Sequence, residues 1–378
     1  MTWREIPARS LLRRQKRVDS WFLSRCGMNL YRGCGHDCAY CDGRAEKYAV
    51  EGEFGAEVVV KVNAVELLRR ELAPTPRRRE SAPSGFVLLG GGVGDSYQPA
   101  EERYELARRA LELLLELGRP VHVLTKSALV ERDLDLLARI HQRSRAIVSM
   151  SFSSVDRQIS ARFEPGVPPP AKRLEVLSRF RRAGIPVGMY LMPVLPFLTD
   201  TEQMLERTME QAAEAGVGFI VFGGLTLRPG RQQEHFLSVL RGIRPDLEER
   251  CRRLYPGDKW GRAAGGHFAA LERRFGALAR RHRVPPRMPP GLYAGILNPA
   301  DRAVVTLKHL DHLLRLRGER SSFGEAARTV ARQPELACEA QQDLFPGRGA
   351  GLAPAAVAVL DELRRTGRST LLESLLGG

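Results

Sequence analysis

The chain has 378 residues, and 43% of them are hydrophobic, which is enough for a large buried core and excludes a disordered protein. Its 59 Lys and Arg outnumber 44 Asp and Glu, giving a formal net charge of +15. Six cysteines in so long a chain do not suggest a secreted disulfide framework, and no apolar run has the length of a membrane span or the character of a signal segment. We therefore expect a cytoplasmic protein without membrane contact.

The positive charge is concentrated in residues 1–33 and 228–287. Basic surfaces attract polyanions, so DNA or RNA is a candidate substrate or partner. A general preference for arginine over lysine would produce the same excess, so the charge alone does not decide. Residues 1–29 are predicted to form a basic, partly helical lead-in, whose Trp21 and Phe22 pack on the domain that follows.

A loop at residues 30–48 holds Cys34, Cys38 and Cys41 at C-x3-C-x2-C spacing. A structural zinc site uses four ligands, and a 4Fe-4S cluster with four cysteines is coordinatively full. Three cysteines therefore suggest a metal centre with one open position. Gly33 and Gly35 let the backbone turn tightly around the first cysteine.

Two other interpretations of this loop stay open. His36 or Cys26 could complete a four-ligand zinc site, or the cysteines could form a redox-active or disulfide-linked loop. The sequence Gly-His-Asp is also ordinary turn chemistry, which favours His36 and Asp37 as turn residues.

With Tyr40 directly before the last cysteine, the loop resembles the radical S-adenosylmethionine (SAM) superfamily, whose signature is C-x3-C-x-aromatic-C. The resemblance implies that the three cysteines hold a 4Fe-4S cluster and that SAM fills the fourth iron site. It also implies an α/β fold, a partial (β/α)6 barrel of the TIM type. The chain is then divided into a lead-in at residues 1–29, the barrel at 30–228 and a mainly helical extension at 229–378.

Short apolar strands and helical segments alternate after the loop, as expected for a parallel sheet. An exposed loop rich in proline and arginine is expected at residues 73–84. Strands are expected at 57–62, 86–89, 121–125, 146–152, 186–192 and 217–222, with helices at 63–72, 100–117, 130–143, 156–162 and 201–215. Further helices are expected near 235–255, 268–282 and 300–317, and small helices after residue 318.

A glycine-rich turn follows the strand at residues 86–89, and there the backbone can approach a small ligand closely. It lacks the patterns of nucleotide phosphate loops and resembles the radical SAM glycine motif, which contacts the methionyl amino group. The residues assigned to SAM binding in this turn are Gly90, Gly91, Gly92, Asp95 and Ser96.

Polar residues at the ends of later strands are further candidates, because the carboxyl ends of barrel strands carry the site. Lys126 is suited to the SAM carboxylate and Ser149 and Ser151, with Ser153, to its ribose, although a surface lysine and serines in a polar barrel interior are the plain alternatives. Glu164 could brace Lys126 or Arg173. Leu195, in a proline-flanked segment, could contact adenine or belong to a simple turn.

Residues 94–101, 124–127 and 162–165 narrow the resemblance to the spore photoproduct lyase-like (DNA repair photolyase-like) branch, over about residues 26–230. That lyase returns a hydrogen atom from a cysteine beside the glycine turn, but residues 90–99 here contain no cysteine. Photoproduct repair itself is therefore in doubt. Cys251 or Cys338 could act instead, although a lone cysteine usually serves packing.

The resulting hypothesis is an enzyme that cleaves SAM reductively to a 5′-deoxyadenosyl radical for hydrogen abstraction on a nucleic-acid substrate, in lyase-like DNA repair or modification. Modification of a peptide or small molecule is the first alternative. A non-catalytic, zinc-bound nucleic-acid-binding protein is the second. The enzyme would need an electron donor such as a flavodoxin or ferredoxin.

Overall fold

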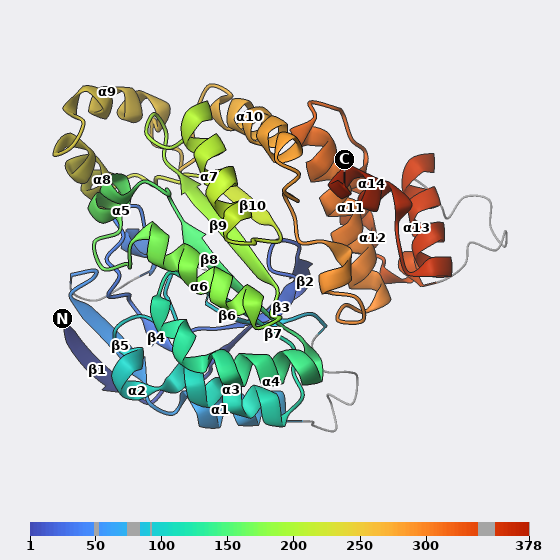
Figure 1. Ribbon diagram of the computed structural model, residues 1–378, viewed down its shortest axis with the longest axis horizontal. Helices are drawn as coiled ribbons and strands as arrows, with labels where there is room; N and C mark the ends of the chain where they lie inside the picture. Colours follow the sequence, from blue (N-terminus) through green and yellow to red (C-terminus); the bar gives the residue numbers. More distant parts are fainter. Residues whose placement is uncertain (49–52, 74–83, 91–92, 339–351, 378) are drawn as a thin grey trace.

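The computed structural model describes residues 1–48, 53–73, 84–90, 93–338 and 352–377. Its centre is a seven-stranded sheet that curls into a half-barrel, with strand order β10-β9-β8-β7-β6-β3-β2 (Figure 1). Neighbouring strands from β3 to β10 are parallel, and only β2 is antiparallel to its neighbour. The strands are β2 (Leu12–Asp19), β3 (Ser24–Met28), β6 (Val87–Leu89), β7 (Val121–Thr125), β8 (Ala146–Phe152), β9 (Val187–Val194) and β10 (Ile220–Gly224).

The first parallel strand of the half-barrel is β3, which pairs with β6. The expectation of a partly helical lead-in was therefore wrong, because residues 1–29 contain β1 (Thr2–Ile6), β2 and β3. The strand expected at residues 57–62 forms as β5 (Glu57–Lys61), but it pairs with β1 and with β4 (Tyr31–Arg32) in a separate sheet. The half-barrel has six parallel strands, as predicted, but it contains β3 in place of the strand at residues 57–61.

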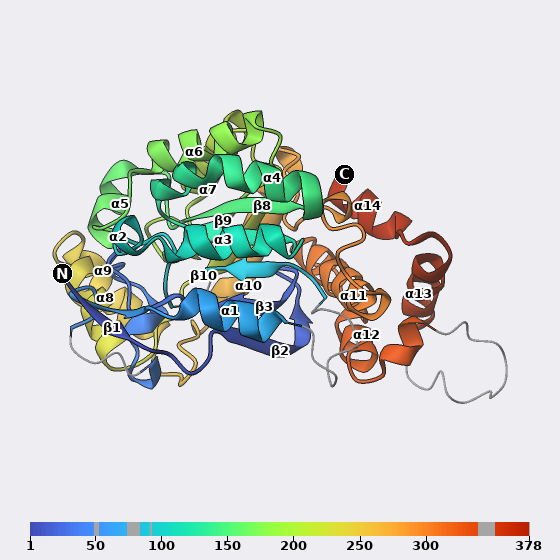
Figure 2. The ribbon, with the colours of Figure 1, turned by 90° about the horizontal axis from the view of Figure 1, so that it is seen from below.

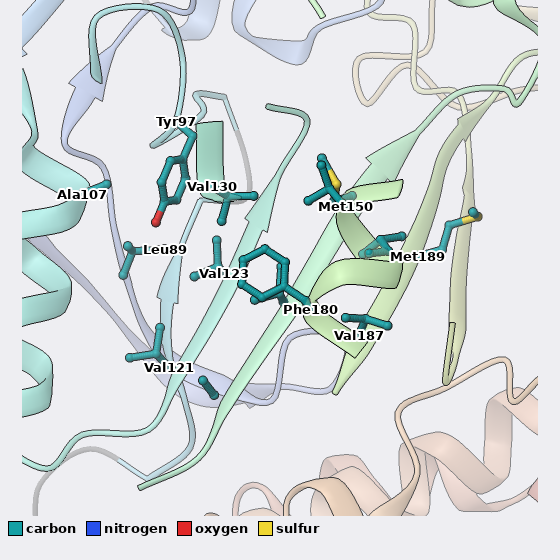
Figure 3. Close-up of a cluster of buried hydrophobic side chains, with 14 of the residues drawn as sticks. Leu89, Tyr97, Ala107, Val121, Val123, Val130, Met150, Phe180, Val187 and Met189 are labelled. Carbon is teal, nitrogen blue, oxygen red and sulfur yellow. The ribbon is translucent and has the colours of Figure 1, made fainter. Parts of the chain in front are cut away.

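Helices cover the convex face of the sheet (Figures 1 and 2). Every second strand residue points to this layer and packs against apolar helix residues, as Leu89, Val123, Met150 and Phe180 illustrate in Figure 3. Glu105, in a left-handed conformation, divides the helix expected at residues 100–117. These helices are α1 (Ala64–Leu72), α2 (Glu101–Tyr104), α3 (Leu106–Glu116), α4 (Leu134–Ser144), α5 (Arg157–Phe163), α6 (Pro170–Arg182) and α7 (Glu202–Glu214).

The extension is mainly helical, as expected, and its helices form two groups. The helices α8 (Arg231–Arg241) and α9 (Pro245–Leu254) pack with Ala39 and Tyr40 of the cysteine loop in one apolar cluster. The second group follows α10 (His267–Arg281), which packs on α7. It consists of α11 (Pro299–Leu316), α12 (Phe323–Val330), α13 (Pro354–Thr366) and α14 (Thr370–Gly377), and it forms a lobe on one side of the half-barrel (Figure 2).

This lobe and the segment that connects it to α10 close the end of the half-barrel at which the parallel strands begin. Ile220, the first residue of β10, donates its N–H to Pro285, and Gly85, just before β6, donates to Ile296. Concave-face residues such as Tyr190 and Phe219 share one apolar cluster with α11. Short 3-10 helices occupy Asp42–Arg44, Glu46–Tyr48, Ala128–Asp133, Pro290–Leu292 and Pro334–Ala337.

Among the described residues, no helix combines the length and the apolar character needed to cross a bilayer. The loop expected at residues 73–84 lies mostly outside the described residues, since only Ala73 and Ser84 are described.

Candidate active site

The three cysteines line a cavity of about 250 Å³ at the carboxyl edge of the half-barrel. Tyr40, Asp95, Lys126 and Ser151 line the same cavity. The structure thus brings together residues that lie more than 110 positions apart in the sequence, at the edge where a parallel barrel carries its site.

The three sulfur atoms are too far apart for one metal ion. Ligands of a single zinc lie about 2.3 Å from it, so their sulfurs lie within about 4 Å of one another. Among the described residues, only Glu206, Glu210 and His282 bring three possible ligand atoms within 4.8 Å of one another. The wider spacing of the cysteines suits a cluster, in which each cysteine binds a different iron.

Among the described residues, neither candidate fourth zinc ligand forms a group of close ligand atoms with the cysteines. His36 lines the same cavity, but its Nδ1 lies 2.9 Å from the carbonyl oxygen of Gly166 and its Nε2 lies 3.2 Å from Oδ2 of Asp95. Cys26 lies in β3 opposite Val87, the first residue of β6, which places it away from the carboxyl edge.

Buried polar side chains hold the cysteine loop in shape. Gln98 accepts a hydrogen bond from the N–H of Gly35 (2.9 Å) and donates one to the carbonyl of Gly33 (3.1 Å). Arg44 donates from Nε to the carbonyl of Cys38 (3.0 Å). These bonds satisfy backbone groups that a tight loop leaves without partners. The loop conformation is therefore fixed by the protein itself.

Burial raises the pKa of the Cys41 thiol to about 11, and it also raises the pKa values of Cys34 and Cys38. A thiol with a raised pKa ionises at neutral pH only when a positive centre stabilises the thiolate. The loop is thus suited to carry thiolates when a metal centre is bound.

Glu164 is the centre of a buried network beside the cavity. Its Oε1 accepts hydrogen bonds from Tyr40 Oη and from Lys126 Nζ (3.0 Å), and its Oε2 accepts from Arg173 (2.6 Å). Lys126 also donates to Ser151 Oγ (2.9 Å). The expectation that Glu164 braces Lys126 or Arg173 is confirmed for both. Burial acts to raise the pKa of Glu164, but the charges of Arg173 and Lys126 hold it well below its usual range.

Asp95 joins the glycine turn to the end of β7. Its Oδ1 accepts from Thr125 Oγ1 (2.7 Å) and its Oδ2 from the N–H of Lys126 (2.8 Å). Burial acts to raise the pKa of Asp95, but its contacts with His36 and with backbone N–H groups keep the pKa below its usual value. Gly90 permits a close approach, since a Cβ there would lie 2.0 Å from the carbonyl oxygen of Leu124. Gly91 and Gly92 lie outside the described residues.

Several predicted SAM-binding residues do not line the cavity. The Oγ of Ser149 lies 2.9 Å from Nε2 of His122, deeper in the barrel. Ser96 and Ser153 are buried, and Leu195 packs in the apolar cluster that contains Tyr40. Ser151 alone of the three alternating serines lines the cavity.

Sequence reasoning missed other residues of the cavity wall. They include Phe22, Asp42, Met192 and Thr226, whereas Pro193, which also lines the cavity, belongs to the proline-flanked segment that was predicted to contact adenine. Asp42 directly follows the last cysteine of the motif, and this adjacency was a usable signal. Phe22 was assigned to packing, and its place on the wall depends on the turn between β2 and β3, which no local pattern indicated.

The family model described as "Radical SAM superfamily" matches residues 28–212. The uncharacterized protein Rv2578c of Mycobacterium tuberculosis is 36% identical over 235 residues, covering 61% of this chain and 67% of the relative. The uncharacterized protein MJ0683 of Methanocaldococcus jannaschii is 28% identical over 212 residues, covering 56% and 74% of the two chains. This chain belongs to the radical SAM superfamily and is an enzyme.

Spore photoproduct lyase, in a structure complexed with dinucleoside spore photoproduct, has a similar fold. The TM-score is 0.56 at 16% identity, and the match covers 75% of this chain and 80% of that chain. The comparison confirms the partial barrel with its helical extension. Membership of the superfamily implies a 4Fe-4S cluster and SAM as cofactors.

Proposed function

We propose that Cys34, Cys38 and Cys41 bind a 4Fe-4S cluster and that SAM binds beside it, against Tyr40, Lys126 and Ser151. When bound, these two groups supply a 5′-deoxyadenosyl radical that abstracts a hydrogen atom from the substrate. The observation that carries this proposal is the joint position on one cavity of a lysine and three cysteines, two buried and one half-buried, which are spaced too widely for a single ion.

The residues of the chain position and shield the reactants. Lys126 presents a positive charge suited to the carboxylate of SAM, and Glu164 fixes that charge through a buried ion pair of 3.0 Å. Ser151 is suited to bind a ribose hydroxyl. Ser149 and Leu195 do not line the cavity, so they would support SAM binding only indirectly, Ser149 through His122 and Leu195 through the apolar cluster that contains Tyr40. Because a radical reacts with whatever lies near, the apolar part of the cavity wall, which includes Phe22, Leu124 and Met192, would limit the access of water and competing groups.

Gly90, Asp95 and Ser96 are proposed to shape the turn that receives the methionyl amino group. Asp95 would do so through its bonds to Thr125 and Lys126, which tie the turn to the neighbouring strand. Gly91 and Gly92 are proposed from the sequence alone.

The proposed substrate is a nucleic acid, for repair or modification, and the reductant is a flavodoxin- or ferredoxin-like electron donor. The support is the formal charge of +15 and the fold shared with a lyase whose solved structure holds a dinucleoside photoproduct. Peptide or small-molecule modification is the competing outcome of the tests.

Anaerobic metal analysis tests the cofactor proposal. Wild type and the Cys338→Ala control, altered in an exposed cysteine of the extension, should carry about four irons per chain and release deoxyadenosine from SAM under a chemical reductant. Cys38→Ala should do neither. A colourless wild type that binds zinc and leaves SAM intact would instead establish the zinc-bound alternative.

Salt dependence tests the nucleic-acid proposal. Binding to single- or double-stranded oligonucleotides should weaken steeply between low and physiological salt, because released counterions drive it. If neither form binds, or binding is insensitive to salt, the substrate is not a nucleic acid.

A further inference from the structure

We infer that Phe22 and Asp42 form a substrate subsite for a planar heterocycle that carries an N–H donor on its edge. The inference rests on the proposed function and deepens it, since it assigns the part of the cavity wall that no cofactor role explains. Both residues line the cavity that also holds the three cysteines and Lys126.

Phe22 offers an aromatic face in a fixed position. Its ring stacks on Tyr190 of β9, with 5.3 Å between ring centroids and an angle of 9° between the planes. Tyr190 Oη donates to the carbonyl of Trp21 (2.5 Å), which ties the turn to the strand. Tyr190 takes one face of the Phe22 ring, and the His122 ring lies 6.4 Å away at an angle of 52°. Because Phe22 lines the cavity, the proposed ligand ring would stack on the face that Tyr190 leaves free. Stacking of this kind favours flat π systems.

The C-terminal extension also contacts the turn between β2 and β3. His309 of α11 places Nε2 2.8 Å from the carbonyl oxygen of Ser20, and the Arg287 guanidinium lies 5.2 Å from the Trp21 ring. Asp19 accepts the N–H of Trp21 (2.8 Å) and closes the turn. Contacts from β9 and from the C-terminal extension thus fix the position of the turn that carries Phe22.

Asp42 offers a hydrogen-bond acceptor at the same cavity. Its Oδ1 is fully engaged, because it accepts from Thr226 Oγ1 (3.0 Å) and Gln232 Nε2 (3.0 Å) and lies 3.1 Å from a nitrogen of Arg228. No hydrogen bond from the described residues reaches Oδ2. A ligand that uses Oδ2 as an acceptor must bring a hydrogen-bond donor.

A flat ring with one N–H donor on its edge meets both conditions. Nucleobases with an imide N–H, such as uracil, have this chemistry, and a methyl group on that nitrogen removes the donor while keeping the ring. Hydrogen bonds to charged groups are among the stronger ones, so the donor should matter measurably.

The test uses anaerobic, cluster-loaded protein with SAM and two single-stranded decamers, deoxyuridine and N3-methyldeoxyuridine. Wild type should prefer the unmethylated decamer by about tenfold in Kd. Asp42→Asn should reduce this preference to about threefold or less. The matched control Asp135→Asn, which alters an exposed acid on the outer helix α4, should keep it. Phe22→Ala should weaken binding of both decamers about tenfold, and Phe22→Tyr should restore it.

Equal binding of the two decamers by wild type, or an unchanged preference in Asp42→Asn with an unchanged Kd in Phe22→Ala, would overturn the subsite. Iron content and the unfolding midpoint of each variant identify any loss caused by misfolding. Release of deoxyadenosine by wild type without an oligonucleotide is measured in parallel. If that release is absent, the proposed function fails; if it is present while the decamer results are negative, only the subsite fails.

Discussion

The two ends of the half-barrel interior treat buried charge differently. At the carboxyl edge, Glu164 accepts hydrogen bonds from four side chains, and Arg173 bonds to Glu164, Ser160 and the carbonyl of Ser151. At the opposite end, burial lowers the pKa values of His309 and His312, which favours their neutral forms. The paired network can hold the cavity-lining side chain of Lys126 in one place, whereas the other end is closed by apolar packing.

The C-terminal extension also has one part at each end of the half-barrel. In the structure, α8 and α9 pack against the cysteine loop, while the lobe of α11 to α14 seals the end where the strands begin. The lobe still influences the site, but indirectly, through the turn that carries Phe22.

The largest effect is expected from breaking the paired network. Arg173→Leu should lower the free energy of unfolding by about 3–5 kcal/mol, because it leaves the buried carboxylate of Glu164 short of positive charge. It should also weaken SAM binding, since Glu164, the ion-pair partner of Lys126, loses one of the contacts that hold it in position. Denaturant unfolding and SAM titration measure both effects. Arg179→Leu, on the exposed side of the same helix, should change neither.

A destabilising substitution in the lobe should lower the free energy of unfolding without changing SAM binding. Leu310→Ala, at a fully buried position of α11, should cost about 3 kcal/mol through lost packing and a cavity. The KM for SAM should stay at the wild-type value. A raised KM together with normal iron content would show that the lobe supports the cofactor site directly.

The buried histidines of the lobe predict a loss of stability in acid. Burial and the nearby charge of Arg287 lower the pKa of His309 to about 3. An unfolded histidine binds a proton below about pH 6.5, so this stability is complete above that pH and is lost as the pH falls toward 3. The loss is at most about 1.4 kcal/mol per pH unit for one histidine. His309→Gln, which can still donate to Ser20, should flatten the fall of the urea midpoint between about pH 6 and 4; an unchanged slope would contradict the assignment.

The smallest effects are expected from substitutions of Ser149 and Ser151 in β8, which should differ in their effect on the KM for SAM. Ser149→Ala should cost about 1 kcal/mol by removing the contact with His122, and it should leave the KM for SAM unchanged. Ser151→Ala should raise that KM severalfold, because Ser151 lines the cavity and bonds to Lys126. Equal KM values for the two variants would remove Ser151 from the proposed SAM contacts.

Much of this architecture was predictable from local sequence patterns. The cysteine motif, five of the six parallel strands and the helical extension follow from spacing and apolar periodicity. The strand β3, with sequence Ser-Arg-Cys-Gly-Met, lacks an apolar run, because only alternate residues are deeply buried. The helix α6 is rich in arginine, and it was not predicted, although Arg173 from it completes the network around Glu164.

Residues whose role depends on tertiary placement were beyond such patterns. Phe22 reaches the cavity only because the turn between β2 and β3 packs on Tyr190, and Ser149 is removed from it by its contact with His122. Alternation correctly placed Ser149 and Ser151 on one face of the strand. Depth along the strand, which sequence does not reveal, decided which of them lines the cavity.

One spectroscopic comparison tests the central claim most directly. The anaerobically reduced protein should give an electron paramagnetic resonance spectrum of a 4Fe-4S cluster that changes when SAM is added, because SAM would bind the iron that the three cysteines leave open. Identical spectra with and without SAM would contradict the claim, and so would an unaltered cluster signal in Cys38→Ala.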